Sequence, residues 1–528
     1  MVSMLEGEGI IIINTATVMA TVTATATATV MATVTESPVK IKIMNAPGIN
    51  EMIVSVNANL KEALVKIDLN AQGLCFVVDE TNKLCGVISD GDIRRALIKG
   101  KDIFVLVGEV METSFTYLSI HSTAQQIQEK LNSKIKYIPL VNEQHVPVDY
   151  ASFSRLHRTP IMQPLLDGNE LSYLTECIKT GWISSQGPFV KRFEKEFADF
   201  CCAEYPVAVS NGTVALHLAL AALGIGPGDE VLVPDLTFAA SINAIIYTGA
   251  TPVIVDVDKV TWTISIEEIK KNLTSKTKAI MPVHLYGHPC HMDEIMEIAI
   301  ENNLFVIEDA AEAIGTFYKN KHVGTFGHAA TFSFFGNKTI TTGEGGMVFF
   351  KNKKDYEKAI ILRDHGMSKE KKYWHDYVGF NYRMTNLQAA LGCAQMERIS
   401  DFIQSKKKLA NTYNEFLKTL NVFELPPEES WASCGFWLYT ALLREDAGIS
   451  RNELIEKLLR NGVETRPVFY PLHEMPPYKG YPTKSDFHNS NRISKQGISL
   501  PSSVNITEQE IENISRALNA IFSSQLIQ

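Results

Sequence analysis

The feature that most constrains the fold of this chain is a long alternation of short apolar runs with helical segments, which begins after Thr159. The runs are rich in β-branched and aromatic residues, and several segments between them have the apolar periodicity of a helix. Strands that alternate with helices are typical of a mostly parallel sheet covered on both faces, because each crossover places a helix on the sheet. The runs are VAVS, EVLVP, TPVIVDV, AIMPVHLYG, LFVIEDA and ATFSFFG. The sequence therefore predicts an α/β domain.

The chain has 528 residues, which favours two to four domains. Residues 15–36 are a Thr/Ala/Val run without a distinct apolar face, as expected of a low-complexity tail. A long helix is predicted over about residues 385–420. The expected divisions are a low-complexity extension at 1–45, a paired module of two strand–turn–strand–helix repeats at 46–155, the large sheet domain at 156–400 and a smaller α+β domain at 401–528.

Composition argues against several classes of protein. The net charge of −9 does not favour nucleic acid as a partner, because phosphate neutralisation needs a clustered positive surface. No stretch is apolar for long enough to span a bilayer, and Glu6 and Glu8 precede residues 10–13 where a secretory signal would have a basic start. The eight cysteines are scattered without a CxxC pair, which indicates reduced, buried thiols. We therefore expect a cytoplasmic protein with no nucleic-acid or membrane partner.

A tetrapeptide at the start of an apolar helix is suited to bind an anion. Residues 210–213 (Ser-Asn-Gly-Thr) follow the run VAVS and open the helix VALHLALAALG. Backbone N–H groups at a helix start, made accessible by Gly212, can bind a phosphate. Taken alone, the tetrapeptide fits an ordinary capped helix better.

Two carboxylates follow an apolar run. Glu308 and Asp309 come after LFVI, at the sheet edge where open α/β sheets bind their ligands. A carboxylate there is costly to bury unless it meets a cation or hydrogen-bond donors. The protonated ring nitrogen of pyridoxal phosphate would be such a cation. An Asp that caps the next helix fits the same residues equally well.

Lys338 lies in a loop between an aromatic strand and a glycine-rich hairpin, within FSFFGNKTITTGEGG. A lysine that bonds covalently to a carbonyl cofactor needs a lowered pKa, which partial burial beside apolar groups supplies. Ser333, five residues earlier, could donate its hydroxyl to the cofactor phosphate. A solvated loop lysine is the alternative.

In this order the motifs resemble the DegT family of sugar-nucleotide aminotransferases, within the fold type I pyridoxal-phosphate enzymes. The resemblance covers about residues 160–519 and includes VPDLTFAAS, HLYG, EDAAEA, SFFGNKTITTGEGG and GFNYRMTNLQAALG. It implies pyridoxal 5'-phosphate as cofactor, a large α/β domain with a smaller α+β domain behind it, and a homodimer with shared active sites. The roles that it implies are covalent attachment and proton transfer for Lys338, the ring nitrogen for Asp309, the phosphate for Gly212, Thr213 and Ser333, ring stacking for Phe238, and a phosphate contact from the neighbouring subunit for Asn381.

Glu312 departs from the wider family, in which Gln or His more often stands beside the cofactor ring. We expect Glu312 to contact the cofactor from the same position. The EDAAEA form resembles the perosamine-synthase branch, as do the stretches WISSQGPFVKRFE and VETRPVFYPLHEMPPY. This branch implies the conversion of GDP-4-keto-6-deoxymannose to GDP-perosamine with L-glutamate as amino donor, and places Trp182, Ser184 and Arg466 at the substrate. A UDP- or dTDP-linked keto-sugar as acceptor, or a catalytically silent binding protein on the same fold, are the alternatives.

The paired module resembles CBS domains. LCGVISDGDIRRAL resembles the family motif, and KYIPLVNEQHVPVDYASFSRL resembles the second member of a CBS pair. The resemblance implies an adenine nucleotide bound by Ser89 and Asp92. The second repeat has Pro147, Val148 and Asp149 in place of the motif, so at most one site is expected. A packing or dimerising module without a ligand is the alternative.

One cluster contains residue types that bind metals: His284, His288, Cys290, His291 and Asp293. Its members lie in HLYGHPCHMD, a strand end that runs through a proline turn into a helix. No spacing there places three of them on one regular face, so we expect no metal.

Overall fold

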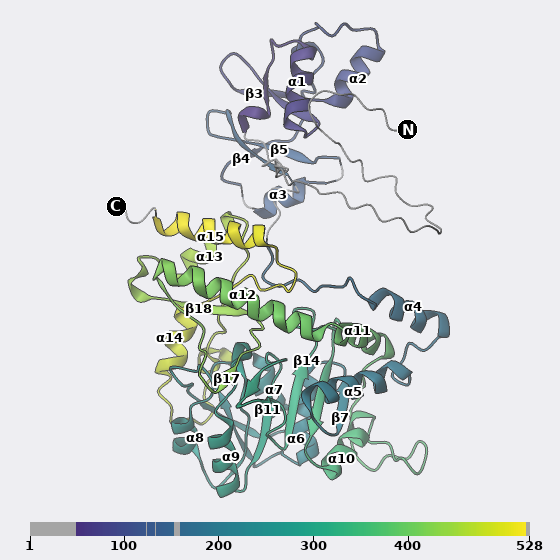
Figure 1. Cartoon of the computed structure of the whole chain (residues 1–528), viewed down its shortest axis with the longest axis vertical. Helices are drawn as coiled ribbons and strands as arrows, with labels where there is room; N and C mark the ends of the chain where they lie inside the picture. Colours follow the sequence, from purple (N-terminus) through teal and green to yellow (C-terminus); the bar gives the residue numbers. More distant parts are fainter. Residues whose placement is uncertain (1–48, 123, 133, 153–158, 524–528) are drawn as a thin grey trace, which may run out of the picture. The chain divides into compact units, whose positions relative to one another are not determined.

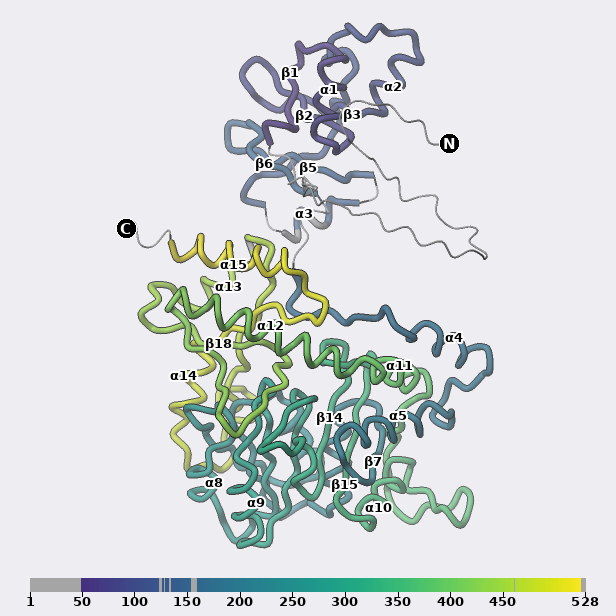
Figure 2. The backbone as a smooth tube through the Cα atoms, viewed as in Figure 1, coloured from purple at the N-terminus to yellow at the C-terminus, as the bar shows by residue number. Residues whose placement is uncertain are grey.

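The computed structural model describes residues 49–122, 124–132, 134–152 and 159–523 (Figures 1 and 2). The predicted extension at 1–45, with its Thr/Ala/Val run, lies outside the described residues. The chain divides into two compact units: Met1–Ile120 with Pro139–Asp149, and His121–Ile138 with Tyr150–Gln528. No helix among the described residues is long and apolar enough to cross a membrane.

The first unit contains the first predicted repeat, and its strand–turn–strand–helix order is present. Strands β2 (Leu74–Val78) and β3 (Leu84–Ser89) pair antiparallel, and β1 (Ile53–Ser55) pairs parallel with β2. Helices α1 (Leu60–Asn70) and α2 (Asp90–Ile98) share one buried apolar cluster with these strands.

The second repeat forms another three-stranded sheet, in the order β4 (Leu118–Ser119), β5 (Tyr137–Val141) and β6 (Pro147–Ser152). Helix α3 (Ala124–Lys130) precedes β5 in the chain. The helix predicted after β6 begins within residues 153–158, which lie outside the described residues.

A seven-stranded sheet forms the centre of the second unit, in the order β7-β15-β14-β11-β10-β8-β9. The pairs from β14 to β9 are parallel, and β15 is antiparallel to both of its neighbours, so only β15 runs against the rest. Its strands are β7 (Pro206–Val209), β8 (Glu230–Pro234), β9 (Thr251–Val255), β10 (Thr277–Ile280), β11 (Phe305–Asp309), β14 (Ala329–Ser333) and β15 (Gly346–Phe350). The predicted mostly parallel α/β sheet is confirmed, although β15 was not among the predicted runs.

Helices cover both faces of this sheet, as two separate buried apolar clusters show (Figure 1). One cluster includes side chains of α5 (Pro188–Cys201), α8 (Ile266–Asn272), α9 (Met292–Glu301) and α11 (Asn386–Met396). The other includes side chains of α6 (Gly212–Leu223), α7 (Ala239–Tyr247) and α10 (Lys353–Arg363). Helix α4 (Glu170–Thr180) precedes α5. Because both faces are buried, the middle residues of most strands are apolar, and charged residues such as Glu230 and Asp309 stand at strand ends.

The last part of the chain builds a four-stranded antiparallel sheet in the order β16-β18-β20-β19. Its strands are β16 (Phe423–Glu424), β18 (Tyr439–Leu443), β19 (Arg466–Pro467) and β20 (Gly497–Leu500), and its helices are α12 (Ile399–Leu420), α13 (Arg451–Arg460), α14 (His488–Gln496) and α15 (Glu508–Ser523). A small sheet joins β12 (Phe317–Tyr318) to β13 (Lys321–His322) and β17 (Ala432–Ser433).

Two sequence-based expectations need correction. The single helix predicted over 385–420 is two helices, α11 and α12, which are separated at Glu397 and Arg398. The eight cysteines are all free, but Cys202 is exposed and Cys85 is only partly buried, so they are not uniformly buried.

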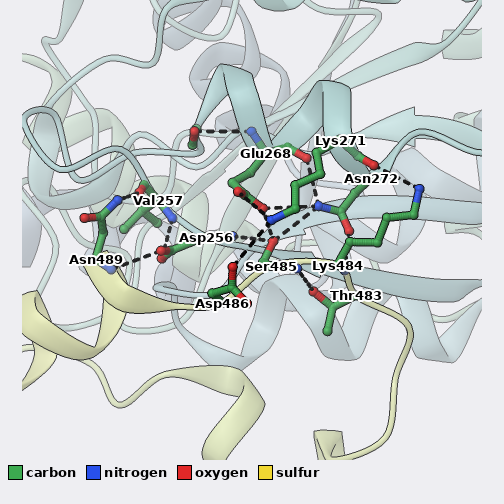
Figure 3. A network of polar contacts seen from close by, with 11 residues as sticks. Asp256, Val257, Glu268, Lys271, Asn272, Thr483, Lys484, Ser485, Asp486 and Asn489 are labelled. Carbon is green, nitrogen blue, oxygen red and sulfur yellow. Dashed lines mark hydrogen bonds and ion pairs between the residues drawn. The ribbon is translucent and has the colours of Figure 1, made fainter.

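A polar network joins the residues after β9 and the end of α8 to the segment before α14 and to the first turn of α14 (Figure 3). The Asn272 side chain donates to Ser485 Oγ at 3.2 Å and accepts from the backbone N–H of Lys484 at 2.7 Å. The Asp256 carboxylate accepts from the backbone N–H of Asn489 at 3.0 Å. These bonds hold residues 484–489 against the large sheet domain.

Candidate active site

A cavity of about 630 Å³ opens at the carboxyl ends of the central strands, a volume typical of a small-molecule site. It brings together eight of the predicted site residues, namely Gly212, Thr213, Phe238, Asp309, Glu312, Ser333, Lys338 and Arg466. Three others do not line it within their own chain: Trp182, Ser184 and Asn381 are exposed elsewhere on the described surface.

One end of the cavity is the N-terminus of α6. The Asn211 side chain caps this helix by accepting from the N–H of Val214 at 3.0 Å, and the first-turn N–H groups of Gly212 and Thr213 have no acceptor within the helix. A Cβ at Gly212 would lie 2.9 Å from the Cβ of Ser333, which stands at the end of β14. Glycine therefore brings the helix N-terminus against the Ser333 hydroxyl, as an anion site requires.

Asp309 ends β11 and is 5% exposed. Its carboxylate accepts from Ser241 Oγ at 2.8 Å and from the backbone N–H of Ala311 at 3.2 Å. Burial raises the pKa of Asp309, and these hydrogen bonds and the nearby Lys338 oppose that rise. A buried carboxylate in the wall of a cavity is suited to pair with a cationic ligand group.

Lys338 follows β14, and its side chain reaches the buried interior of the cavity. Its Nζ lies 3.8 Å from Glu312 Oε1 and 3.7 Å from the ring centroid of Trp437. Burial lowers the pKa of Lys338, against the opposing effect of Glu312 and then of Asp309. A lysine with a lowered pKa contains more of the neutral amine that attacks a carbonyl.

Aromatic and basic side chains form the mouth of the cavity. Phe238 is the N-cap residue of α7, 60% exposed, with its ring 5.9 Å from that of Phe469. Arg466 lies on β19 from the four-stranded sheet, and its guanidinium is 3.7 Å from Glu464. The cavity therefore offers an open aromatic face and a partly exposed cation to a ligand.

The sequence did not reveal three residues that shape the site. Ser241, one helical turn after Phe238, bonds to Asp309. Tyr286 has φ 51° and donates its backbone N–H to Glu312 Oε2 at 2.9 Å. Trp437 comes from a distant segment, so no local pattern places it at Lys338. The motif VPDLTFAAS contains Ser241, but only the fold shows which way its hydroxyl points.

Glu308 and His284 form a buried structural pair rather than part of the cavity. His284 Nε2 lies 3.1 Å from Glu308 Oε2, and the Glu308 carboxylate also accepts from the backbone N–H groups of Gly324, Phe326 and Gly327. His284 Nδ1 accepts from the N–H of Cys290 at 3.0 Å. Over the parts of the chain that are described, no group of three His, Cys, Asp or Glu side chains is arranged to hold a metal.

The chemical types of the cavity residues fit the groups of pyridoxal phosphate. An anion site at the α6 N-terminus suits the phosphate, Asp309 suits a protonated ring nitrogen, and Lys338 with its lowered pKa suits the aldehyde. Phe238 also lines the cavity and is partly exposed, so its ring can stack on the cofactor ring.

Comparisons with known proteins agree with this geometry. The profile of the DegT/DnrJ/EryC1/StrS aminotransferase family matches residues 164–519, and that of the CBS domain matches residues 40–99. The chain is 47% identical to the GDP-perosamine synthases of Escherichia coli O157:H7 and Caulobacter vibrioides, over 69% and 70% of this chain and 99% of each relative. A Streptococcus pneumoniae protein solved in its PLP form is 26% identical, with a TM-score of 0.65 over 70% of this chain and 99% of its own. The chain therefore belongs to the DegT/DnrJ/EryC1/StrS family of pyridoxal-phosphate-dependent sugar aminotransferases, with a CBS domain before the enzyme.

Proposed function

We propose that this sugar aminotransferase transfers the amino group of L-glutamate to GDP-4-keto-6-deoxymannose and forms GDP-perosamine. The observation that carries the proposal is 47% identity, over nearly the whole length of the relatives, to proteins named GDP-perosamine synthase. Glu312 in the cavity supports it further, because the sequence pattern around this residue is the one that resembles the perosamine-synthase branch. The alternative acceptors are UDP- or dTDP-linked keto-sugars.

In this proposal the predicted residues of the cavity have the following roles. Lys338 would hold the cofactor covalently and would also serve as the acid and base that transfers protons during the reaction. Asp309 would pair with the ring nitrogen and keep it protonated, and pyridoxal phosphate would supply an electron sink. Gly212, Thr213 and Ser333 bind the phosphate, Phe238 stacks on the ring, and Glu312 lies beside it.

A transamination assay with a panel of keto-sugars tests the substrate. Purified protein is incubated with L-glutamate and with 3- and 4-keto sugars linked to GDP, UDP or dTDP, and 2-oxoglutarate and the amino-sugar are measured. We expect turnover of the GDP-linked 4-keto-6-deoxy sugar and of no other at a comparable kcat/KM. Turnover of UDP- or dTDP-linked sugars alone would overturn the choice of substrate and leave the aminotransferase assignment standing.

Borohydride reduction tests the role of Lys338. Reduction fixes a lysine–cofactor bond, so mass spectrometry of the digested protein should find the label on Lys338. Lys338→Ala should remove the label and the activity, because no neighbouring group replaces the lost nucleophile. Lys351→Ala, at an exposed position after β15, is the matched control. A label on another lysine contradicts the assignment, and a protein that binds no cofactor would favour the silent alternative.

We also propose a homodimer whose active sites are shared. Asn381 is exposed, forms an isolated backbone β-bridge with Asp364 and does not line the cavity of its own chain. In the proposed dimer it reaches the phosphate of the second copy. The segment just before Asn381 exposes Tyr373 and Val378, whose exposed fractions are 79% and 93%. Exposed apolar side chains of this kind are typical of a contact between subunits.

Mixed dimers test this sharing. Lys338→Ala and Asn381→Ala are each expected to inactivate a homodimer, whereas a mixed dimer of the two regains one site with both residues intact. Mixed dimers without activity would contradict the shared site.

The remaining assignments are part of the same proposal. Arg466 at the cavity mouth contacts the substrate, and Trp182 and Ser184, which lie outside the cavity of their own chain, reach the substrate of the second copy. We also propose that the chain has four parts, at 1–45, 46–155, 156–400 and 401–528. We further propose that the protein is cytoplasmic and that an adenine nucleotide binds at Ser89 and Asp92.

A further inference from the structure

Lys406, in the middle of α12, is buried and has no acidic partner. Its side chain is 1% exposed, and over the described part of the chain no Asp or Glu forms an ion pair with it. Its Nζ donates to the carbonyl of Trp437 at 2.9 Å and to the carbonyl of Ser502, and lies 3.3 Å from Met162 Sδ. The lysine therefore joins three segments that are far apart in the sequence.

An amine in this position costs free energy that an apolar side chain would not. Burial lowers the pKa of Lys406 to about 7, which shows how poorly the surroundings solvate its charge. If this side chain only filled space, leucine or methionine would stabilise the fold more than lysine does. What the amine adds is hydrogen bonding to two buried carbonyls, for which no other donor is found among the described residues.

One of those carbonyls belongs to the residue that covers Lys338. The Trp437 ring centroid lies 3.7 Å from Lys338 Nζ, and its indole Nε1 donates to the carbonyl of Asn337 at 2.6 Å. The same ring stacks on Tyr286, with centroids 6.0 Å apart and planes 9° apart. Trp437 is thus held through its backbone by Lys406 and through its side chain by the residue before Lys338.

We propose that Lys406 is a positioning residue for Lys338 and acts through Trp437. The Lys406 amine fixes the backbone of Trp437, so the indole stays over one side of the Lys338 amine and limits the directions in which that amine points. The proposal rests on the role of Lys338 given above, and concerns the geometry of its amine before the cofactor arrives.

The rate at which the cofactor-free protein forms a covalent bond with pyridoxal phosphate tests the proposal, followed by absorbance over a range of pH. Lys406→Met should slow this rate by about tenfold or more, because small misplacements of a reacting group are costly. Lys406→Arg keeps donors for the two carbonyls and should recover part of the rate. Lys408→Met, an exposed change on the same helix, should leave it unchanged.

A double-mutant cycle separates positioning through Trp437 from a general effect on stability. Trp437→Ala keeps the backbone carbonyl but removes the ring, so Lys406→Met should have little further effect in that background. Leu518→Ala, a buried change in the same domain, measures what destabilisation alone does. A wild-type rate in Lys406→Met, additive effects with Trp437→Ala, or the same slowing in Leu518→Ala would each overturn the proposal. If Lys338→Ala still bonded the cofactor, the role of Lys338 would fail instead.

Discussion

Lys338 Nζ and Glu312 Oε1 face each other at 3.8 Å inside a cavity where both side chains are buried. Burial raises the pKa of Glu312 and lowers that of Lys338, so each group moves towards its neutral form, and their mutual attraction opposes both shifts. The two shifts therefore bring the pKa of Glu312 and the pKa of Lys338 closer together than they are in water.

Glu312→Gln should move the pH dependence of cofactor uptake downwards. The Glu312 carboxylate raises the pKa of Lys338, so its removal lowers that pKa and increases the neutral amine at any pH below it. In the cofactor-free protein, the pH at half-maximal rate of bonding to pyridoxal phosphate should fall. Glu344→Gln, at an exposed position that also lines the cavity, should leave the midpoint in place. An upward shift or no shift in Glu312→Gln would contradict the coupling.

Asp309→Asn should lower kcat by about 10²-fold or more, because it keeps the shape of the side chain but loses the charge opposite the cofactor ring. Ser241→Ala should have a smaller effect in the same assay, since it removes one donor to Asp309 and leaves the carboxylate. Steady-state kinetics with saturating glutamate measure both. Equal losses in the two variants would mean that the charge of Asp309 is not what matters.

The elements that the sequence predicted well are those with a strong local pattern. The apolar strands, the helix that opens at Gly212 and the loop that carries Lys338 each follow from a short run of residues. The break between α11 and α12 does not, because tertiary contacts cause it. Glu397 there accepts from Tyr173 and Asn169 of the distant α4 region and binds Arg192 of α5.

The same distinction explains which site residues could be found. Asp309 and Lys338 stand at the ends of predicted strands, where an open sheet gathers its ligands. Trp437 reaches Lys338, and Lys406 reaches Trp437, only through long-range packing, and each lies in an apolar or helical stretch that has no sign of function. For Asn381 the family resemblance implied a contact from the neighbouring subunit, and this residue does not line the cavity of its own chain.

Gly212→Ala should weaken cofactor binding by about tenfold or more, because the added Cβ would lie 2.9 Å from Ser333 Cβ and push the two sides of the anion site apart. Equilibrium binding of pyridoxal phosphate to the cofactor-free protein measures this. Gly226→Ala is the matched control, since its Cβ would meet nothing closer than 3.6 Å. Unchanged affinity in Gly212→Ala would show that the phosphate binds elsewhere.

Asp92 of the CBS domain already has hydrogen-bond partners of its own. Its Oδ2 accepts from the backbone N–H of Ser89 at 2.9 Å and from Ser89 Oγ at 2.6 Å, in a capping box at the start of α2, and its other oxygen binds Arg95. A ribose would have to share this carboxylate with the cap. Any adenine nucleotide should therefore bind at this one site and change the aminotransferase rate by about fivefold or less, the lower end of allosteric coupling.

Calorimetry with AMP, ADP, ATP and S-adenosylmethionine decides whether the site exists. The wild-type protein should bind at least one of the four, and Asp92→Ala should bind none. Asp92→Ala removes the N3 side chain of the capping box, so a melting curve must show that this variant is folded at the assay temperature. Asp90→Ala, which removes only an exposed ion pair to Arg94, should bind as the wild type does. No heat with any ligand, or equal binding by Asp92→Ala, would leave the Ser89/Asp92 pair as a helix cap in a packing module.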